Sequence, residues 1–462
     1  GYLLPALSQA KERQIVLSVP TKILQNQIME EEGKRLKEVF HIDIHSLKGP
    51  HNYLKLDAFY RSLQENDENR LFRRFKMQLL VWLTETETGD LDEIGQLYRY
   101  QHFLSDLRHD GNLSSQSLFV TEDFWKRSQE RAQTCKLLVT NHAYLVTRLE
   151  DNPEFVSDRL LIIDEVQKIL LALENLLQET HDIQSIIDLL DKALLEEQNK
   201  VQQRILESIR FECLYLIEQF QSGKSKKNIL DSLTNLHQYF SELEVEGFEE
   251  LVRYFTVEGD YWLEATETSQ KKIQISSTKS GRILLSSLVP DSCQVLGVSA
   301  TLEISQRVSL ADLLGYPEAK FVKIEAGKKQ DQEVVMVKDF PLVTETSLEV
   351  YAQEVADLLM DIQAFQQPIL VLFTAKDMLL AVSDLLPVSH LAQYKNGDVH
   401  QLKKRFEKGE QQILLGAASF WEGVDFSSHP FVIQVVPRLP FQNPQEPLTK
   451  KINQELNQEG KN

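Results

Sequence analysis

Short runs of apolar residues alternate with longer amphipathic stretches along this chain. Before residue 300, strand-length runs occur at residues 14–19, 135–140, 160–163 and 294–298. Uninterrupted apolar runs are typical of strands that a parallel sheet buries on both faces. Further runs follow at residues 369–374, 412–416 and 431–436. The pattern therefore predicts an α/β protein with two parallel sheets.

Two long segments between these runs have helical periodicity. In residues 69–76 basic and aromatic residues interleave, which suits either a solvated helix face or contact with a nucleic-acid single strand; we favour the solvated face. Residues 168–258 are almost wholly helical in pattern, and a hairpin within residues 261–275 is expected to lead back to the main sheet. The expected segments are a first domain at 1–54, 113–167 and 286–315, mainly helical insertions at 55–112 and 168–285, and a second domain at 316–462.

Two adjacent carboxylates end the apolar run at residues 160–163. Asp164 and Glu165 would emerge at the carboxyl end of a parallel strand, where α/β proteins bind ligands. In a nucleotide-driven motor, Asp164 would hold Mg²⁺ and Glu165 would orient or deprotonate the attacking water. The same pair can also mark a strand that meets a solvated turn, so the assignment depends on other motifs.

Polar residues at other strand ends are weaker signals. Thr21 can cap a helix that begins at Lys22, and a hydroxyl at such a turn also suits a phosphate contact. His142, at the exit of the run at residues 135–140, is interpreted as structural rather than catalytic. His41 and His45 have no third ligand nearby and are expected at the surface.

Composition and charge narrow the class of protein. The chain has 462 residues and a formal net charge of -19, which argues against coating of duplex DNA but not against a local basic groove for a single strand. Its three cysteines, Cys135, Cys213 and Cys293, lack metal or disulfide spacing, which favours the reducing cytoplasm. No apolar run approaches the roughly 18 residues of a membrane span, and no signal peptide is recognisable. We expect a cytoplasmic protein without membrane contact.

The order of several motifs resembles that of the DinG/XPD group of superfamily 2 helicases, over most of the chain. The most specific piece is residues 419–425, Ser-Phe-Trp-Glu-Gly-Val-Asp, followed by Leu-Pro-Phe at residues 439–441; it is similar to motif V of bacterial DinG proteins. Residues 164–167, Asp-Glu-Val-Gln, lie where the family has Asp-Glu-Ala-His. The remaining matches are motif Ia at Thr21 and Gln25, motif III at Ser299, Ala300 and Thr301, and motif IV at Thr374.

The resemblance implies two RecA-like domains and a DNA helicase or translocase that hydrolyses ATP with Mg²⁺. It implies movement from 5′ to 3′ on single-stranded DNA, in repair or replication. It gives catalytic roles to Asp164, Glu165 and Gln167, with Asp164 at the Mg²⁺, and nucleotide contacts to Gly423 and Asp425. Contact with nucleic acid, or its coupling to ATP, falls to Thr21, Gln25, Ser299, Ala300, Thr301, Thr374 and Ser419. The expected partner of a monomer is single-stranded DNA or DNA with a single-stranded overhang.

The sequence departs from the family pattern in four places. Residues 1–7 resemble the helix after the P-loop, so the phosphate-binding Gly-Lys-Thr is expected before Gly1, and motif VI is expected after Asn462. Lys55 stands where the first cluster cysteine would be, and an iron–sulfur cluster needs four thiolates, so no cluster is expected. This resembles the cluster-free DinG proteins of Gram-positive bacteria. Gln167 replaces the usual His of the acidic box, which leaves its coupling role open.

Two functions from different classes follow. The first is an ATP-driven translocase on single-stranded DNA, and the alternative is a degenerate helicase that binds nucleic acid without hydrolysis. The P-loop lysine and the motif VI arginines supply much of the charge stabilisation in the transition state, so residues 1–462 alone are expected to be inactive as an ATPase. A nuclease centred on Asp164 would need further carboxylates, which the sequence does not place.

Overall fold

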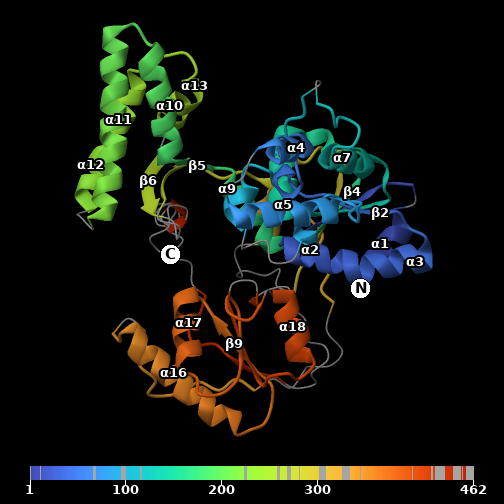
Figure 1. Cartoon of the computed structure of the whole chain (residues 1–462). Helices are drawn as coiled ribbons and strands as arrows, with labels where there is room; N and C mark the ends of the chain where they lie inside the picture. Colours follow the sequence, from blue (N-terminus) through green and yellow to red (C-terminus); the bar gives the residue numbers. More distant parts are fainter. Residues whose placement is uncertain are drawn as a thin grey trace.

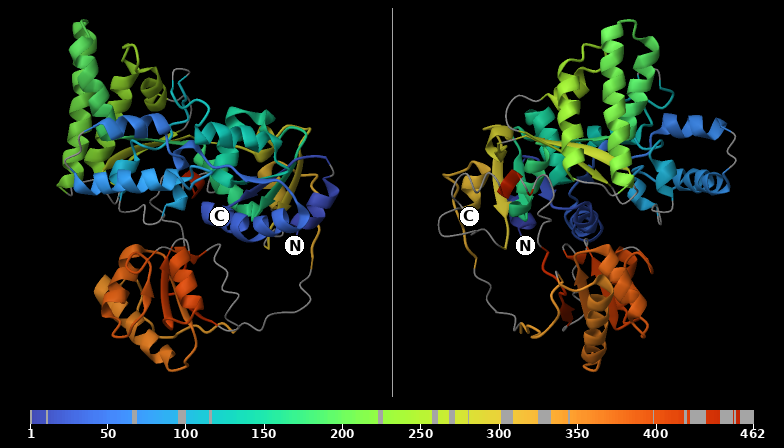
Figure 2. Two further views of the ribbon diagram at one scale, coloured as in Figure 1. Left: turned by 45° about the vertical axis from the view of Figure 1, so that its right-hand side comes forward. Right: turned by 90° about the vertical axis from the view of Figure 1, so that its left-hand side faces the viewer.

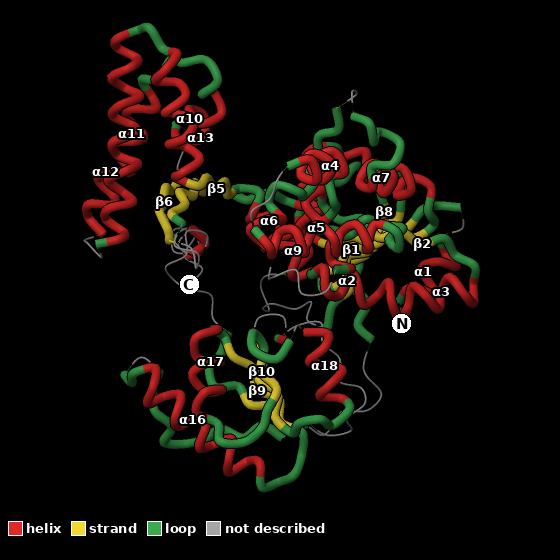
Figure 3. The backbone as a smooth tube through the Cα atoms, viewed as in Figure 1, coloured by secondary structure: helices red, strands yellow, loops and turns green. Residues whose placement is uncertain are grey.

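A computed structural model gives the fold of the chain as two parallel sheets, a small antiparallel sheet and helical insertions (Figures 1 and 3). The structure describes residues 2–10, 12–65, 69–94, 100–114, 117–222, 226–256, 261–267, 272–279, 281–300, 309–324, 333–343, 345–397, 399–417, 420–421, 432–440, 449 and 451–453. Both parallel sheets confirm the predicted α/β class.

The first sheet has five parallel strands. In spatial order they are β2 (Ile44–Ser46), β3 (Leu137–Asn141), β1 (Ile15–Val19), β4 (Leu160–Asp164) and β8 (Gln294–Val298). Every residue of β1 and β3 is buried, as their apolar runs predict. The expectation that residues 294–298 form a buried strand is wrong: β8 lies at the edge of the sheet, and Leu296 is 41% exposed.

Helices cover both faces of this sheet. The helices packed on one face are α1 (Leu3–Gln9), α2 (Lys22–Ile28) and α3 (Lys34–Phe40), against Ile15 and Leu17 of β1. The other face, which includes Val16, packs against α7 (Phe124–Thr134), α8 (His142–Asp151), α9 (Ile169–Asn175), α14 (Leu285–Leu288) and α15 (Leu310–Leu314). Adjacent strand residues point to opposite faces, so each apolar run fills two cores.

The first insertion is helical. It contains α4 (Leu56–Gln64), α5 (Arg70–Leu83) and α6 (Gln101–Leu104), around a core that includes Phe75 and Leu79. Phe72 stacks on Phe103 and Phe75 on Tyr100, so these aromatic rings of α5 pack inside the insertion. Arg70, Arg73 and Arg74 are exposed. The interleaved segment is thus an amphipathic helix whose arginines form a solvated basic face, as we favoured, whereas Lys76 is buried against Phe72.

The second insertion projects away from the first sheet (Figures 1 and 3). Its helices are α10 (Ile183–Glu196), α11 (Lys200–Gln221), α12 (Lys226–Ser241) and α13 (Glu249–Phe255). Its three antiparallel strands, in spatial order, are β5 (Gln178–Asp182), β7 (Ile273–Lys279) and β6 (Tyr261–Glu267). The β6–β7 hairpin was expected; it also pairs with β5, and the chain then returns to the first sheet at β8, as predicted. The prediction of almost wholly helical structure for residues 168–258 is wrong at β5, because antiparallel pairing with β7 holds that polar segment extended.

The second parallel sheet forms a separate unit with its own helices (Figure 2). Its strands, in spatial order, are β10 (Leu391–Ala392), β11 (Ile413–Ala417), β9 (Ile369–Phe373) and β12 (Ile433–Val435). The helices are α16 (Leu348–Gln363), α17 (Lys376–Leu385) and α18 (Val399–Glu407). All residues of β9 and β11 are buried. Short 3₁₀ turns occupy Pro50–Asn52, Leu91–Glu93, Pro153–Val156 and Val166–Lys168, and a π turn occupies Met29–Gly33.

Candidate functional site

The acidic pair lies at the carboxyl edge of the first sheet, at the end of a central strand. Asp164 is the last residue of β4 and is partly buried. Burial raises the pKa of its carboxyl group, and so does the charge of Glu165, while the hydrogen bond with Tyr2 lowers it. A bound Mg²⁺ would reverse this balance because it favours the ionised form. Asp164 is therefore a suitable cation ligand in a partly dehydrated place.

Glu165 begins a tight turn, and the backbone of this turn sets the direction of its side chain. Its backbone is left-handed, with φ 47° and ψ 53°, a conformation that costs a non-glycine residue on the order of 1 kcal/mol. Gln167 Nε2 donates to Glu165 Oε2 at 2.7 Å. Gln167 thus holds the carboxylate of the predicted water-activating residue. The Oε1 atom of Gln167 is buried and has no hydrogen-bond partner within the part of the chain that is described.

The strand end that carries the predicted motif III lies directly beside this turn. Parallel pairing sets Asp164 against Val298 of β8, so Ser299 and Ala300 leave the sheet at the same edge. Gly297 allows the close approach: a Cβ atom there would lie 3.1 Å from Val166 Cγ2. Sequence order alone gave no sign of this contact. Thr301 lies outside the described residues.

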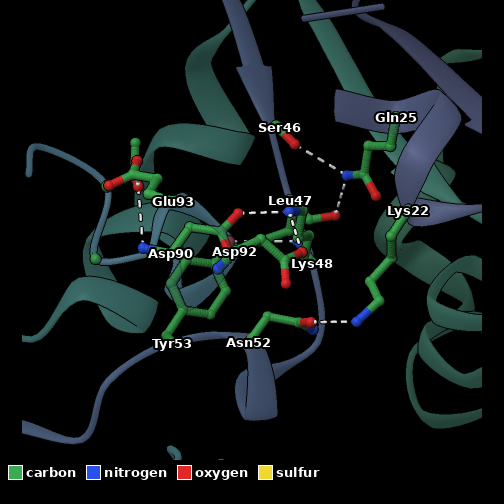
Figure 4. Close-up of polar contacts among 12 residues, drawn as sticks. Lys22, Gln25, Ser46, Leu47, Lys48, Asn52, Tyr53, Asp90, Asp92 and Glu93 are labelled. Atoms are coloured by element: carbon green, nitrogen blue, oxygen red, sulfur yellow. Dashed lines mark hydrogen bonds and ion pairs between the residues drawn. The ribbon is translucent and has the colours of Figure 1, made fainter. Parts of the chain in front are cut away.

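The side chains of Thr21 and Gln25 differ in the groups that they can contact. Thr21 caps α2, accepting a hydrogen bond from the Leu24 amide at 3.2 Å, as predicted. Gln25 is fully buried, and its amide nitrogen lies 3.0 Å from both Ser46 Oγ and the Leu47 carbonyl oxygen (Figure 4). Its Oε1 accepts from Asn141 Nδ2 at 3.1 Å. The expectation that Gln25 contacts nucleic acid directly is therefore wrong, because its polar atoms are hydrogen-bonded to residues at the ends of β2 and β3.

His142 reaches the acidic turn from two strands away. The ring is 2% exposed, and its Nδ1 lies 2.7 Å from Ser18 Oγ of β1. Burial lowers the pKa of His142 to about 4, while the main chain of Asp164 and Glu165 acts to raise it. Sequence reasoning saw only a structural histidine. The signal available was its position directly after Asn141, which caps α8 at the exit of β3.

The carboxyl edge of the second sheet presents Thr374, which is exposed directly after β9. Trp421 Nε1 donates to the Phe373 carbonyl oxygen at 2.8 Å, so the segment predicted to be motif V begins next to the one predicted to be motif IV. Phe420 packs over Gly416, where a Cβ atom would lie 2.5 Å from the ring. The predicted site residues Ser419, Gly423 and Asp425 lie outside the described residues.

A buried ion cluster attaches the first insertion to the first sheet. Lys48, two residues after β2, is 1% exposed, and its Nζ lies 2.5 Å from Asp90 Oδ2 and 2.9 Å from Asp92 Oδ2. Figure 4 shows these contacts beside the Gln25 hydrogen bonds. Close by, Lys55, at the expected cysteine position, pairs with Asp110 at 2.7 Å. Ion pairs therefore lie where the chain passes from the first sheet into the first insertion.

Candidate metal ligands are sparse elsewhere. Within the described ranges, no group of three or more His, Cys, Asp or Glu residues is arranged to hold a metal ion. Burial raises the pKa of the Cys135 thiol to about 11, which disfavours the thiolate that ligation needs. His45, expected at the surface, is instead partly buried, and its Nε2 lies 2.8 Å from Ser128 Oγ. Among the residues described, no helix is long and apolar enough to cross a bilayer.

Known proteins similar to this chain include several DinG relatives. Residues 358–462 match the family described as the helicase C-terminal domain. The 3′-5′ exonuclease DinG of Bacillus subtilis is 24% identical over 571 residues, covering 100% of this chain and 61% of the relative. The protein of the same name from Staphylococcus epidermidis is 23% identical, covering 96% and 58%. This chain thus spans about three fifths of the length of these relatives.

The solved structures similar to this chain include one titled XPD helicase. It has a TM-score of 0.47 and 13% identity and covers 96% of this chain and 80% of that structure. The match to the helicase C-terminal domain lies in the part of the chain that forms the second parallel sheet. The DinG relatives, which align along the whole of this chain or nearly so, support a helicase of the DinG/XPD type.

Proposed function

We propose that this chain is the motor part of an ATP-dependent DNA helicase that translocates on single-stranded DNA. The observation that carries the proposal is the acidic turn at the carboxyl end of β4, with Asp164 partly buried and Glu165 held by Gln167 at 2.7 Å. In this proposal Asp164 holds Mg²⁺, which supplies charge neutralisation at the ATP phosphates. Glu165 takes a proton from the attacking water or orients it, as a general base does.

The remaining roles are assigned to residues near the ends of strands. Ser299, Ala300 and Thr301 would couple the acidic turn to DNA, because the first two leave β8 beside Asp164. Thr21 and Thr374, at the ends of elements in the two sheets, would contact the DNA backbone together with Ser419. Gly423 and Asp425 would contact the nucleotide. Gln25 would act indirectly, through its hydrogen bonds with the ends of β2 and β3.

The proposed domain plan assigns 1–54, 113–167 and 286–315 to the first helicase domain and 316–462 to the second. The segments at 55–112 and 168–285 are its insertions. We propose further that the protein is a cytoplasmic monomer in repair or replication and carries no iron–sulfur cluster. Lys55, paired with Asp110 at 2.7 Å, supports the last point because an ammonium group cannot replace a thiolate ligand.

The experiment is ATP hydrolysis and strand displacement by the full-length protein. We expect Mg²⁺-dependent turnover that single-stranded DNA stimulates, and displacement on duplexes with a 5′ overhang but not on those with a 3′ overhang. Displacement from the 3′ overhang alone would contradict the proposed polarity. DNA binding without turnover under any of these conditions would favour the non-hydrolysing helicase instead.

A further inference from the structure

His142 makes a hydrogen bond with Ser18 that couples the tautomer of the ring to the direction of the serine hydroxyl. The ring is 2% exposed, and such burial favours the neutral form of an imidazole. A neutral imidazole has one donor nitrogen and one acceptor nitrogen. Ser18 Oγ lies 2.7 Å from Nδ1, and when this hydroxyl donates, the proton of the ring must be on Nε2. In that arrangement Nε2 is a donor.

That donor has no acceptor within hydrogen-bonding geometry in the described part of the chain, although it is buried. Buried polar atoms are almost always paired, so an exception calls for an explanation. Ser18, which holds the ring, pairs with Ile163 of β4, directly before Asp164 and Glu165, so the ring lies beside the main chain of these two residues. Catalytic hydrogen bonds are often long without substrate and shorten when it binds. The carbonyl groups of the acidic turn are therefore the acceptors within reach.

We propose that His142 is a positioning residue, whose Nε2–H donates to a main-chain carbonyl of Asp164 or Glu165 and holds the acidic turn in register for hydrolysis. Gln167 fixes the Glu165 carboxylate, whereas His142 fixes the backbone that carries it. The left-handed backbone of Glu165, with φ 47°, is the feature that needs such a restraint. This inference rests on the proposed ATP hydrolysis for its kinetic consequence but not for its hydrogen bond.

The position of His142 also joins the turn to the β1 and β3 ends. Ser18 is part of β1, three residues before the α2 cap at Thr21. Asn141, which precedes His142, donates to the buried Gln25. A conformational change at the end of β3 would thus be transmitted to the acidic turn through the side chain of His142.

The test separates the two ring nitrogens by substitution in the full-length protein. In His142→Asn the amide can replace Nδ1 and keep the Ser18 bond, but it cannot reach the place of Nε2. In His142→Gln the amide can replace Nε2. His45→Asn is the matched control, since burial likewise lowers the pKa of His45 to about 4, and it bonds Ser128 instead of the turn.

We expect His142→Asn to lower kcat for ATP about 10- to 100-fold, the usual cost of slight misplacement, with KM changed less than about twofold. His142→Gln should recover most of kcat, and His45→Asn should match the wild type. Equal kcat in wild type and His142→Asn would overturn the proposal. So would equal losses in His142→Asn and His142→Gln, because a general packing role would not distinguish them.

Two measurements decide the hydrogen bond independently of turnover. Long-range ¹H–¹⁵N spectra of histidine-labelled protein should show His142 as the Nε2–H tautomer, and Ser18→Ala should release that preference. Amide exchange in the peptide that holds residues 164–168 should be faster in His142→Asn than in His45→Asn. An Nδ1–H tautomer in the wild type, or unchanged exchange, would overturn the inference. Failure of the wild type to hydrolyse ATP would contradict only the proposed function, and the spectra of the wild type and Ser18→Ala would still decide the hydrogen bond if His142→Asn did not fold.

Discussion

Removing the charge of Lys48 should detach the first insertion from the first sheet. Lys48→Met keeps the apolar stem of the side chain but leaves Asp90 and Asp92 without their cation. Asp90 is 16% exposed and Asp92 is 34% exposed, so Asp92 can recover much of its hydration whereas Asp90 cannot. Burial already raises the pKa of Asp90 despite the attraction of Lys48, which identifies it as the carboxylate that suffers most.

The expected loss follows from that geometry. Breaking a buried ion pair by removing one partner costs about 3–5 kcal/mol, and the partial exposure of Asp92 favours the lower end, about 3 kcal/mol. Lys55→Met is the matched control in the same insertion. Asp110, the partner of Lys55, is 52% exposed, so solvent screens that pair and its loss should cost under about 1 kcal/mol.

The assay is urea unfolding of the wild type and the two variants, followed by amide exchange in residues 55–112. Lys48→Met should unfold at lower urea and exchange faster throughout the insertion. Asp90→Asn added to Lys48→Met should recover part of the loss, because the amide keeps the cap on the Asp92 amide without a buried charge. Equal unfolding midpoints for Lys48→Met and Lys55→Met would refute the reasoning.

Three further outcomes are expected. Anaerobically purified protein should contain no stoichiometric iron by metal analysis, since Lys55 cannot ligate it and burial keeps Cys135 protonated; stoichiometric iron would contradict this. The pKa of His45 falls from 6.5 to about 4 on folding, so the unfolded state binds more protons between these values, and the free energy of unfolding should drop by up to about 3 kcal/mol as pH falls from 6.5 to 4. His45→Asn should make that dependence less steep in urea titrations, and the remainder is expected from His142, whose pKa burial also lowers to about 4. Gly297→Ala should cost about 1–3 kcal/mol of stability by overpacking against Val166, and added Val166→Ala should restore part of it; an unchanged unfolding midpoint would exclude the close contact.

The sequence predicted those features that depend on neighbouring residues. The apolar runs at β4 and β9 identified central strands, because burial on both faces selects continuous hydrophobicity. Thr21 was recognisable as a cap because helix capping is local.

Features that depend on distant partners escaped prediction. The polar strand β5 exists through its pairing with β7, nearly a hundred residues later in the chain. His142 acquires its place from Ser18, 124 residues earlier, and no periodicity encodes such a contact. Gln25 was assigned to contact with nucleic acid or its coupling to ATP, yet its side chain is buried among four hydrogen-bond partners from two separate segments.

The central claim, that Glu165 activates water for ATP hydrolysis, is tested most directly by Glu165→Gln in the full-length protein. The amide keeps the size of the side chain but cannot accept a proton, and loss of a general base lowers the rate about 10²- to 10⁴-fold. Asp164 remains in the variant, so Mg²⁺-dependent ATP binding should persist. Glu150→Gln, at an exposed position of α8, is the control and should turn over ATP like the wild type. Steady-state turnover of Glu165→Gln close to that of Glu150→Gln, with the same ATP affinity, would contradict the account.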